Sequence, residues 1–241
     1  MIKTCDLRKE YQDVVAVDGV SLEVREGELF ALLGVNGAGK TTLIKMLTCL
    51  TAPTSGDAFI AGHSVLTEKE AVKELIDVSM QETAVARNLT VEENIEFYAA
   101  LNGRSKEEIE KTKATLYSAF ELGTVKGKRA AKLSGGWQRK LSIALALVSE
   151  PKVLFLDEPT LGLDVIARRE LWKTICDLKG KMTIVLTTHY MEEAEALADR
   201  IGIMKGGKLL FVGTKQELYE TTGKENVEDA FIRMVGGDLD A

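Results

Sequence analysis

The glycine-rich segment at residues 34–42 constrains the fold of this chain more than any other feature. It reads G-V-N-G-A-G-K-T-T, and it lies between an apolar run at residues 29–33 and a helix-like segment at 43–47. A strand, a glycine-rich turn and a helix in this order form a cradle for phosphate groups. Glycines let successive backbone N–H groups turn toward an anion, and the positive end of the helix dipole adds to their field. The segment therefore predicts an α/β fold with a nucleoside triphosphate site.

The residue types within this cradle have separate expected roles. Lys40 supplies a mobile positive charge for the outer phosphates, and the Thr41 hydroxyl is a ligand for Mg²⁺. The residues expected to surround the phosphates are Gly34, Asn36, Gly37, Ala38, Gly39, Lys40, Thr41 and Thr42. The alternative is a glycine-rich turn that carries a lysine by chance. The strand and the helix on either side weigh against that alternative.

Composition describes an ordinary globular protein. The 241 residues are 45% hydrophobic and 28% charged, enough for one large domain or two small ones. A net charge of −6 gives no reason to expect nucleic-acid binding. Three scattered cysteines, at positions 5, 49 and 176, indicate neither a disulfide framework nor a zinc site and fit a reducing cytosol. We expect no signal peptide and no segment that crosses a membrane.

The order of the predicted elements indicates one domain over residues 1–241. Strands are expected at 2–7, 20–24, 29–33 and 58–60, followed by helices between 90 and 120 and at 134–148. After residue 151, strands at 153–156, 183–187 and 201–204 alternate with helices at 165–178 and 191–198, and 208–212 completes a hairpin. This pattern predicts an α/β core interrupted by a helical insert at about 88–149. A short helical tail is expected at about 214–241.

A second motif is an apolar strand that ends in two acids. Residues 153–158 read V-L-F-L-D-E. Because the carboxyl ends of parallel strands face the ligand crevice, we expect Asp157 to meet the Mg²⁺ held by Thr41. Glu158 then lies one residue further toward the attacking water. An acidic turn after a buried strand is the alternative, and the phosphate cradle makes it less probable.

The third motif, residues 133–138, reads L-S-G-G-W-Q. Ser134 is expected at a helix N-cap, and Gly135 and Gly136 expose the backbone N–H groups that follow it. This predicts a second anion site, far along the chain from the first. A flexible helix cap without a ligand is the alternative for this short segment alone.

Together these motifs resemble the nucleotide-binding subunit of an ATP-binding cassette (ABC) transporter. The cradle and the acid strand resemble the family's two Walker motifs, and residues 133–138 resemble its signature motif. Gln81 matches the Q-loop, residues 161–164 the D-loop, His189 the switch histidine and Tyr11 the aromatic that stacks on adenine. The resemblance covers essentially the whole chain. It implies a P-loop NTPase core with an N-terminal antiparallel β subdomain and an inserted helical subdomain.

The resemblance also implies a mechanism that uses ATP and Mg²⁺. Two such domains pack head to tail, as a homodimer or a heterodimer, so that the signature motif of one closes over ATP bound by the other. Glu158 is the implied base and His189 the γ-phosphate sensor, with Gln81 and Asp157 near the metal. The residues that would contact ATP from the partner are Ser134, Gly135, Gly136 and Gln138. The implied partner is a multi-span permease, with this chain in the cytoplasm on the inner face of the membrane.

Two alternatives stay open at this stage. A soluble ABC-type ATPase of iron–sulfur assembly, DNA repair or ribosome rescue would share these motifs, whereas a P-loop kinase or GTPase would lack the Ser134-Gly135-Gly136 segment. Residues 188–195 and the ending near 229–231 resemble drug and lipid exporters. The docking surface for a membrane subunit is expected between the Gln81 loop and the helix that begins at Thr90, near Phe97 and Tyr98.

Overall fold

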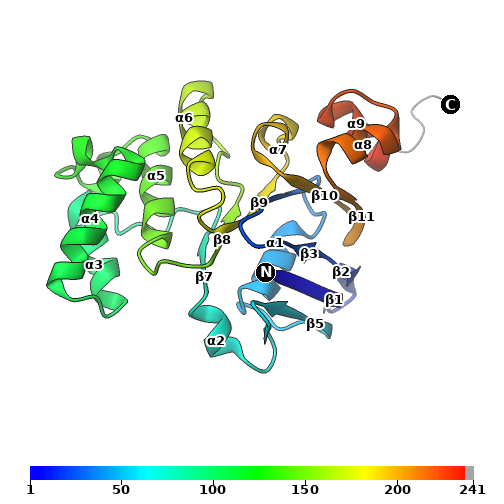
Figure 1. Cartoon of the computed structure of the whole chain (residues 1–241), viewed down its shortest axis with the longest axis horizontal. Helices are drawn as coiled ribbons and strands as arrows, with labels where there is room; N and C mark the ends of the chain where they lie inside the picture. Colours follow the sequence, from blue (N-terminus) through cyan, green and yellow to red (C-terminus); the bar gives the residue numbers. More distant parts are fainter. Residues whose placement is uncertain (237–241) are drawn as a thin grey trace.

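A six-stranded sheet forms the centre of the computed structural model, which describes residues 1–236 (Figure 1). Its strands lie in the order β11-β10-β4-β9-β8-β7, and all neighbours are parallel except β10 and β11, which form an antiparallel hairpin. The bounds are β4 (Leu29–Leu33), β7 (Ile76–Ser79), β8 (Val153–Asp157), β9 (Thr183–Thr188), β10 (Arg200–Lys205) and β11 (Lys208–Gly213). The carboxyl ends of β4, β7, β8 and β9 therefore meet at one edge of the sheet.

Alternating side chains give this sheet two separate cores. In β4, Leu29, Ala31 and Leu33 join one buried cluster, whereas Phe30 and Leu32 join the other. Successive side chains of a strand point to opposite faces, so a strand buried on both faces reads as a continuous apolar run. This explains why residues 29–33 are wholly apolar.

The second core lies between the central sheet and a five-stranded antiparallel sheet. That sheet has the order β2-β1-β5-β6, with β3 paired to β1. Its strands are β1 (Ile2–Tyr11), β2 (Val14–Val20), β3 (Glu23–Val24), β5 (Ser55–Ile60) and β6 (His63–Ser64). Helix α1 (Lys40–Leu47) contacts β2, β5 and β8, and it buries Leu43, Ile44 and Met46 between the two sheets. A short helix, α2 (Lys69–Lys73), precedes β7.

The insert between β7 and β8 is helical and lies at one end of the molecule, at the left of Figure 1. It contains α3 (Val91–Leu101), α4 (Lys106–Phe120), two short 3₁₀ helices (Leu122–Val125 and Ala130–Lys132) and α5 (Gly135–Ala146). The two capping patterns are confirmed, because Thr90 with Glu93 and Ser105 with Glu108 each exchange both capping hydrogen bonds. These helices therefore begin where the sequence predicts.

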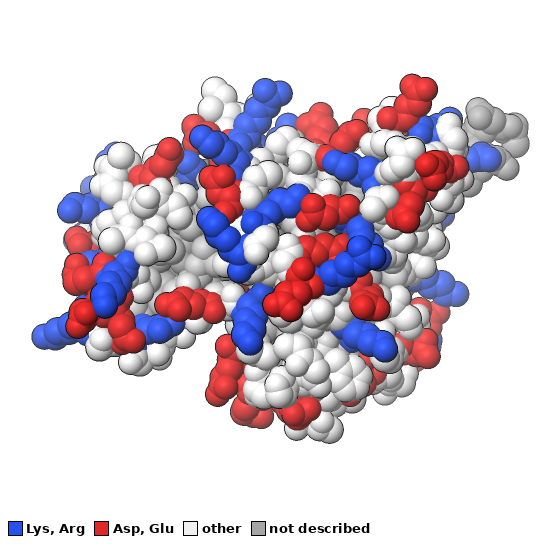
Figure 2. Space-filling model, viewed as in Figure 1, with Lys and Arg blue, Asp and Glu red and all other residues white. Residues whose placement is uncertain are grey.

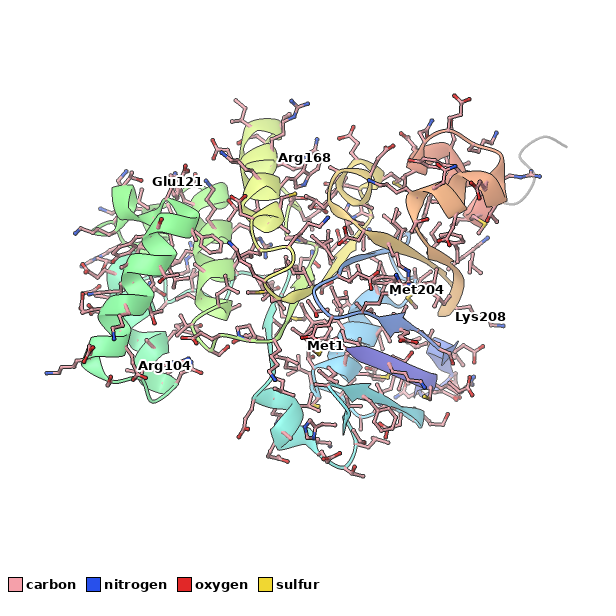
Figure 3. The ribbon with its side chains drawn as sticks, viewed as in Figure 1. Met1, Arg104, Glu121, Arg168, Met204 and Lys208 are labelled. Carbon is pink, nitrogen blue, oxygen red and sulfur yellow. The ribbon has the colours of Figure 1, made fainter. Side chains whose placement is uncertain are left out.

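The remaining helices complete the first core. They are α6 (Val165–Cys176), α7 (Met191–Leu197), α8 (Lys215–Thr222) and α9 (Val227–Gly236). Arg168 of α6, which is labelled in Figure 3, forms an ion pair with Glu192 of α7 at 3.3 Å. None of the helices within residues 1–236 is both long and apolar enough to cross a membrane. The end of the expected tail, residues 237–241, lies outside the described part.

The strand expected at residues 20–24 differs from the one observed. The chain instead forms β2, which ends at Val20, and the two-residue β3. The Thr4 hydroxyl donates to the carbonyl of Val20 and accepts from the N–H of Leu22, each at 2.8 Å. This side chain therefore bonds to the backbone at the point where the strand is interrupted. Residues 14–20 were not predicted as a strand, because the Asp18-Gly19 pair within them is typical of a turn. Edge strand β7 was missed as well.

Candidate active site

Four strand ends bring the predicted motifs together. Leu33 of β4 pairs with Thr188 of β9, and Asp157 of β8 pairs with Thr187. The loops that follow these strands surround a cavity of about 580 Å³. Its lining consists of Val14, Val15, Ala16, Asn36, Gly37, Ala38, Gly39, Lys40, Thr41, Thr42, Gln81, Glu158, Leu161, His189 and Gly206. The phosphate cradle, Gln81, Glu158 and His189 thus share one site.

The glycine loop has a shape that other residues could not adopt. Gly37 and Gly39 have φ angles of +80° and +103°, in the region that favours glycine. A Cβ atom at Gly39 would lie 2.3 Å from the carbonyl oxygen of Ala16, and one at Gly34 would lie 2.7 Å from that of Met204. The loop therefore packs directly against the backbone of β2 and β10.

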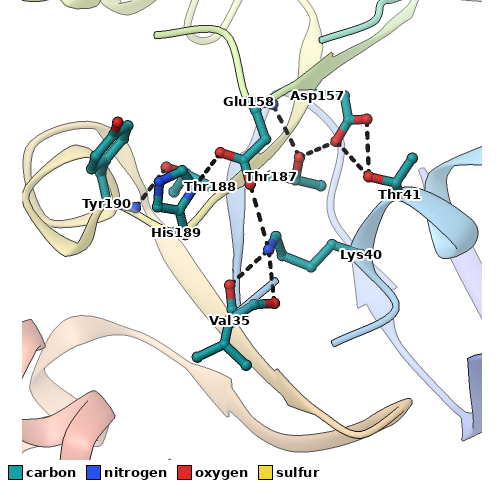
Figure 4. A network of polar contacts seen from close by, with 10 residues as sticks. Val35, Lys40, Thr41, Asp157, Glu158, Thr187, Thr188, His189 and Tyr190 are labelled. Carbon is teal, nitrogen blue, oxygen red and sulfur yellow. Dashed lines mark hydrogen bonds and ion pairs between the residues drawn. The ribbon is translucent and has the colours of Figure 1, made fainter. Parts of the chain in front are cut away.

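Lys40, the first residue of α1, turns its side chain back toward the loop. Its Nζ donates to the carbonyl oxygen of Gly34 at 2.6 Å and to that of Val35 at 3.3 Å (Figure 4). It also lies 3.5 Å from Oε1 of Glu158, and only 6% of the lysine is exposed. The ammonium group is thus held at the centre of the cavity by oxygen atoms.

Asp157 is fully buried and is contacted by two hydroxyl groups. Thr41 Oγ1 lies 3.1 and 3.3 Å from the two carboxylate oxygens, and Thr187 Oγ1 donates to Oδ1 at 2.5 Å. The ion pairs found in the described residues do not include Asp157. A buried carboxylate held by hydroxyl groups alone is a strong ligand for a hard cation.

Glu158 lies between the lysine and the histidine. Its Oε1 faces Lys40, and its Oε2 is 2.5 Å from Nδ1 of His189 (Figure 4). The backbone of Glu158 has a φ of +51°, which is uncommon for a residue other than glycine, and its N–H donates to Thr187. This left-handed turn directs the carboxylate into the cavity instead of along the strand.

Gln81 lies on the irregular segment that follows β7. Gln81 lines the cavity, and its carbonyl oxygen accepts a hydrogen bond from Arg139 of α5. Sequence reasoning did not single out Arg139, because an arginine in a helix usually faces solvent. Thr187 was missed too, although a threonine at the end of a buried strand is a signal for a polar role.

The signature segment lies outside this cavity. Ser134 is the N-cap of α5, as predicted, but its side chain caps no backbone N–H group. A Cβ atom at Gly136 would lie 3.0 Å from Cβ of Ala167 in α6, so this glycine also allows close helix packing. Gln138 donates from Nε2 to the carbonyl oxygen of Leu133 at 3.0 Å. Ser134 and Gly136 line a separate small hollow, together with Ala167 and Glu170 of α6.

Tyr11 lies beside the cavity rather than in its lining. It is the last residue of β1, 45% exposed, with the ammonium group of Lys9 4.9 Å from the ring centroid. The neighbouring residues Val14, Val15 and Ala16 of β2 do line the cavity. These small apolar side chains give the cavity an apolar wall next to the phosphate cradle, which the sequence did not reveal.

A further carboxyl group is buried behind His189. Glu193 of α7 is fully buried, and it accepts a hydrogen bond from Nε1 of Trp172 at 3.1 Å. Burial raises the pKa of Glu193, and the nearby Glu158 carboxylate raises it further, while hydroxyl groups of Thr188 and Thr160 oppose the shift. Glu193 therefore holds its proton to a higher pH than an exposed glutamate does.

Comparison with known proteins assigns this chain to a family. A model of the ABC transporter family matches residues 17–161. The chain is 42% identical to the doxorubicin resistance ATP-binding protein DrrA of Mycobacterium tuberculosis, over 97% of this chain and 70% of that protein. It is 45% identical to human ATP-binding cassette sub-family A member 2, over 92% of this chain and 9% of that much longer protein.

Solved structures agree with this assignment. The ATP-binding subunit of an ABC transporter superimposes with a TM-score of 0.86 at 28% identity, covering 97% of this chain and 99% of that one. A dimeric ATP-binding cassette with bound ADP and Pi superimposes with a TM-score of 0.79 at 26% identity, covering 89% and 98%. The predicted ABC ATPase fold is confirmed. The chain therefore belongs to the ABC transporter family and is one of its ATP-hydrolysing subunits.

Proposed function

We propose that this chain cleaves ATP at the cavity around Lys40 and passes the energy to a membrane-spanning exporter. The observation that carries the proposal is the Glu158 carboxylate, held between Lys40 at 3.5 Å and His189 at 2.5 Å beside the glycine loop. Lys40 binds the outer phosphates, and Glu158 accepts a proton from the attacking water. His189 keeps the carboxylate oriented and senses the γ-phosphate with its other ring nitrogen.

Mg²⁺ fits the oxygen groups of this site. The Thr41 hydroxyl and the Asp157 carboxylate lie together, and Gln81 lines the same cavity. Within residues 1–236 no group of three His, Cys, Asp or Glu side chains forms a metal site of its own, so the ion would also need phosphate oxygens. When bound, it would neutralise charge on the phosphates. Thr41, Asp157 and Gln81 are the residues we expect to hold it.

Two copies of the chain would complete the site. The signature residues Ser134 and Gly136 line a hollow apart from the ATP cavity of their own chain. The first N–H groups of α5 therefore have no phosphate to bind within one copy, and a head-to-tail partner would bring them to one. Val165 and Ile166, at the start of α6, are 57% and 73% exposed. They would add apolar contact area to the dimer interface. The partner is a second copy or a close relative.

Mixing two inactive variants tests this arrangement. In a head-to-tail homodimer, Ser134→Arg damages the site of the partner, whereas Glu158→Gln damages the site of its own chain. A mixed dimer then has one intact site, so mixing the two inactive proteins should restore roughly a quarter of normal ATPase activity. Each variant alone should stay inactive. Mixtures without activity would contradict a signature segment that acts on the partner.

The membrane partner would dock beside the Gln81 loop. Phe97 on α3 is 48% exposed, and Tyr98 donates from its hydroxyl to the carbonyl of Ala84 at 2.7 Å, which ties α3 to that loop.

We place the chain in the cytoplasm, on the inner face of the membrane. The names of the relatives, with doxorubicin resistance and phospholipid transport among them, favour export of a drug or a lipid. The alternative, a soluble ABC-type ATPase, is not favoured by these relatives and would have a different partner, so it serves as the second candidate in the test that follows.

Co-purification tests the membrane partner. The chain should be recovered from detergent extracts with a multi-span subunit encoded beside it, and reversing the charge of Glu82 and Arg87 should release it while ATP binding persists. The matched control is charge reversal at Lys111, which lies on α4 away from the loop and is paired with Glu107. Recovery with ribosomes, DNA or an iron–sulfur scaffold instead would favour the second candidate.

A further inference from the structure

Helix α5 and the segment that follows it are joined to strand β7 by a row of polar contacts. Ser149 Oγ donates to Oδ2 of Asp77 at 3.0 Å, near the beginning of the strand. The hydroxyl groups of Ser142 and Ser79 lie 3.1 Å apart near its end, and both residues are buried. Because the contacts follow the strand from one end to the other, β7 and α5 hold one fixed register.

Arg139 extends this row beyond the end of the strand. Its Nη1 donates to the carbonyl oxygen of Met80 at 2.7 Å, and its Nη2 donates to that of Gln81 at 2.5 Å. The arginine is 4% exposed, and burial lowers its pKa although the carboxylates of Asp157 and Glu193 oppose the shift. A planar guanidinium group can hold two neighbouring oxygens at once, which a lysine ammonium group cannot do with the same fixed geometry.

The segment that Arg139 holds has no regular structure of its own. Residues 80–89 contain neither helix nor strand, so the backbone hydrogen bonds of a regular element do not fix the position of Gln81. Gln81 nevertheless lines the ATP cavity. Contacts from outside the segment must therefore fix where Gln81 lies, and Arg139 donates one hydrogen bond to Gln81 itself and one to its neighbour Met80.

We propose that Arg139 is a positioning residue for ATP hydrolysis, acting through Gln81. The inference rests on the proposed function, in which Gln81 helps to hold the metal. Arg139 stands five residues after Ser134 on the same helix, so a displacement of the signature segment moves the guanidinium group and with it the Gln81 loop. The signature segment, which would meet the ATP of a partner, is thereby tied to the cavity of its own chain.

A double-mutant cycle tests this route. Arg139→Lys keeps the charge but loses the paired geometry, and we expect it to lower kcat about tenfold while the affinity for ATP without Mg²⁺ stays within about twofold. Gln81→Ala should lower kcat as well. If Arg139 acts through Gln81, adding Arg139→Lys to Gln81→Ala should lower kcat no further. Ser149→Ala, which removes a contact at the far end of β7, is the matched control and should leave kcat and KM unchanged.

Hydrogen exchange gives a readout without nucleotide. Amides of residues 80–87 should exchange faster in Arg139→Lys than in the native chain, whereas those of α3 should not change. Arg139→Met removes the charge as well as both hydrogen bonds, so its effect on kcat and exchange should be larger. If Arg139→Met does not fold, the same measurements on Arg139→Lys test the proposal. Multiplicative losses of kcat in the double variant, or unchanged exchange of residues 80–87, would overturn the proposal. If Gln81→Ala alone keeps normal activity, the role of Gln81 in the proposed function fails as well. If Gln81→Ala is slow but Arg139→Lys is not, only the role of Arg139 fails.

Discussion

At the residue scale, the site depends on side chains that are aimed by unusual backbone. Glu158 adopts a left-handed conformation that a residue other than glycine adopts at a cost of about 1 kcal/mol or more. The chain tolerates this because the N–H of Glu158 bonds to Thr187 and the carboxylate lies between Lys40 and His189. Interactions around the residue therefore hold a conformation that the residue alone would not favour.

Replacing Lys40 tests the phosphate cradle. Lys40→Ala should abolish turnover and weaken ATP binding about 10- to 100-fold, because the phosphates lose a charged donor in a buried site. Titration with a fluorescent ATP analogue measures the affinity. Lys45→Ala is the matched control, since Lys45 lies on the same helix but not in the lining of the cavity. An unchanged affinity in Lys40→Ala would remove the cradle from the nucleotide site.

Replacing Glu158 separates binding from chemistry. Glu158→Gln keeps the size and most hydrogen bonding of the side chain but removes the base, so ATP should bind at near-native affinity with turnover reduced at least about 100-fold. Because ATP is then not consumed, a dimer should accumulate on size-exclusion chromatography in the presence of ATP. A variant that remains monomeric and fully active would contradict both the base and the dimer.

Glu193 gives a pH-dependent prediction. Its pKa is raised from 4.5 by burial, so the folded protein holds this proton to higher pH than the unfolded chain does. The contribution of Glu193 to the free energy of unfolding therefore falls as the pH rises above 4.5, until the folded group also ionises. Glu193→Gln should become more stable relative to the native chain over this range. Urea denaturation at several pH values measures the difference.

The control for this prediction lies on the same helix. Glu192→Gln removes a carboxylate whose side chain is 72% exposed. A stability difference between Glu193→Gln and the native chain that stays constant with pH would show that the buried carboxyl group does not carry the effect.

At the element scale, the sequence predicted elements whose signals are local. The capping pattern at Thr90 and the glycine loop depend on neighbouring residues, and both occur as expected. Strand β7 was missed because its four residues, Ile76–Ser79, are too few for a clear period. The tie from Arg139 to Gln81 was missed because its partners lie 58 and 59 residues away and are backbone atoms. No side-chain pattern in a single sequence reports such a contact.

A buried lysine links helices α3 and α4 at the helical end of the molecule. Lys113 of α4 has 8% of its side chain exposed, and it lies within 3.1 Å of Glu92, 2.7 Å of Glu96 and 2.7 Å of Glu110. Two of these carboxylates belong to α3, so the lysine joins the two helices. Without its cation, three carboxylates would repel one another across the contact.

Lys113→Met should therefore lower the free energy of unfolding by about 1–3 kcal/mol. The control is Lys111→Met on the same helix, whose ion pair with Glu107 joins side chains that are 73% and 80% exposed. It should change stability by less than about 0.5 kcal/mol. Urea denaturation measures the free energy of unfolding of both variants. Equal losses of free energy would show that the ion pairs of the buried lysine stabilise the protein no more than an exposed pair does.

At the scale of the whole molecule, the face drawn in Figure 2 carries mixed charge, with Lys and Arg side chains lying among Asp and Glu side chains. This differs from the basic stripe that is typical of nucleic-acid-binding proteins. The exposed apolar residues Phe97 and Leu101, 48% and 68% exposed, instead gather on one helix at the end of the molecule. The proposed docking surface therefore combines an exposed apolar side chain, Phe97, with the charged residues Glu82 and Arg87.

The strand order of the central sheet also has a consequence during synthesis of the protein. Strand β4, which carries the glycine loop, pairs with β9 and β10, so that Leu29 lies beside Ile184. At about 5–20 residues per second, a ribosome adds the 150 or so intervening residues in roughly 10–30 s. During that time β4 has neither of its neighbours. The nascent chain must therefore carry an exposed apolar segment and an unformed nucleotide cradle until most of the protein has been made. Chaperones would bind the apolar segment during this interval.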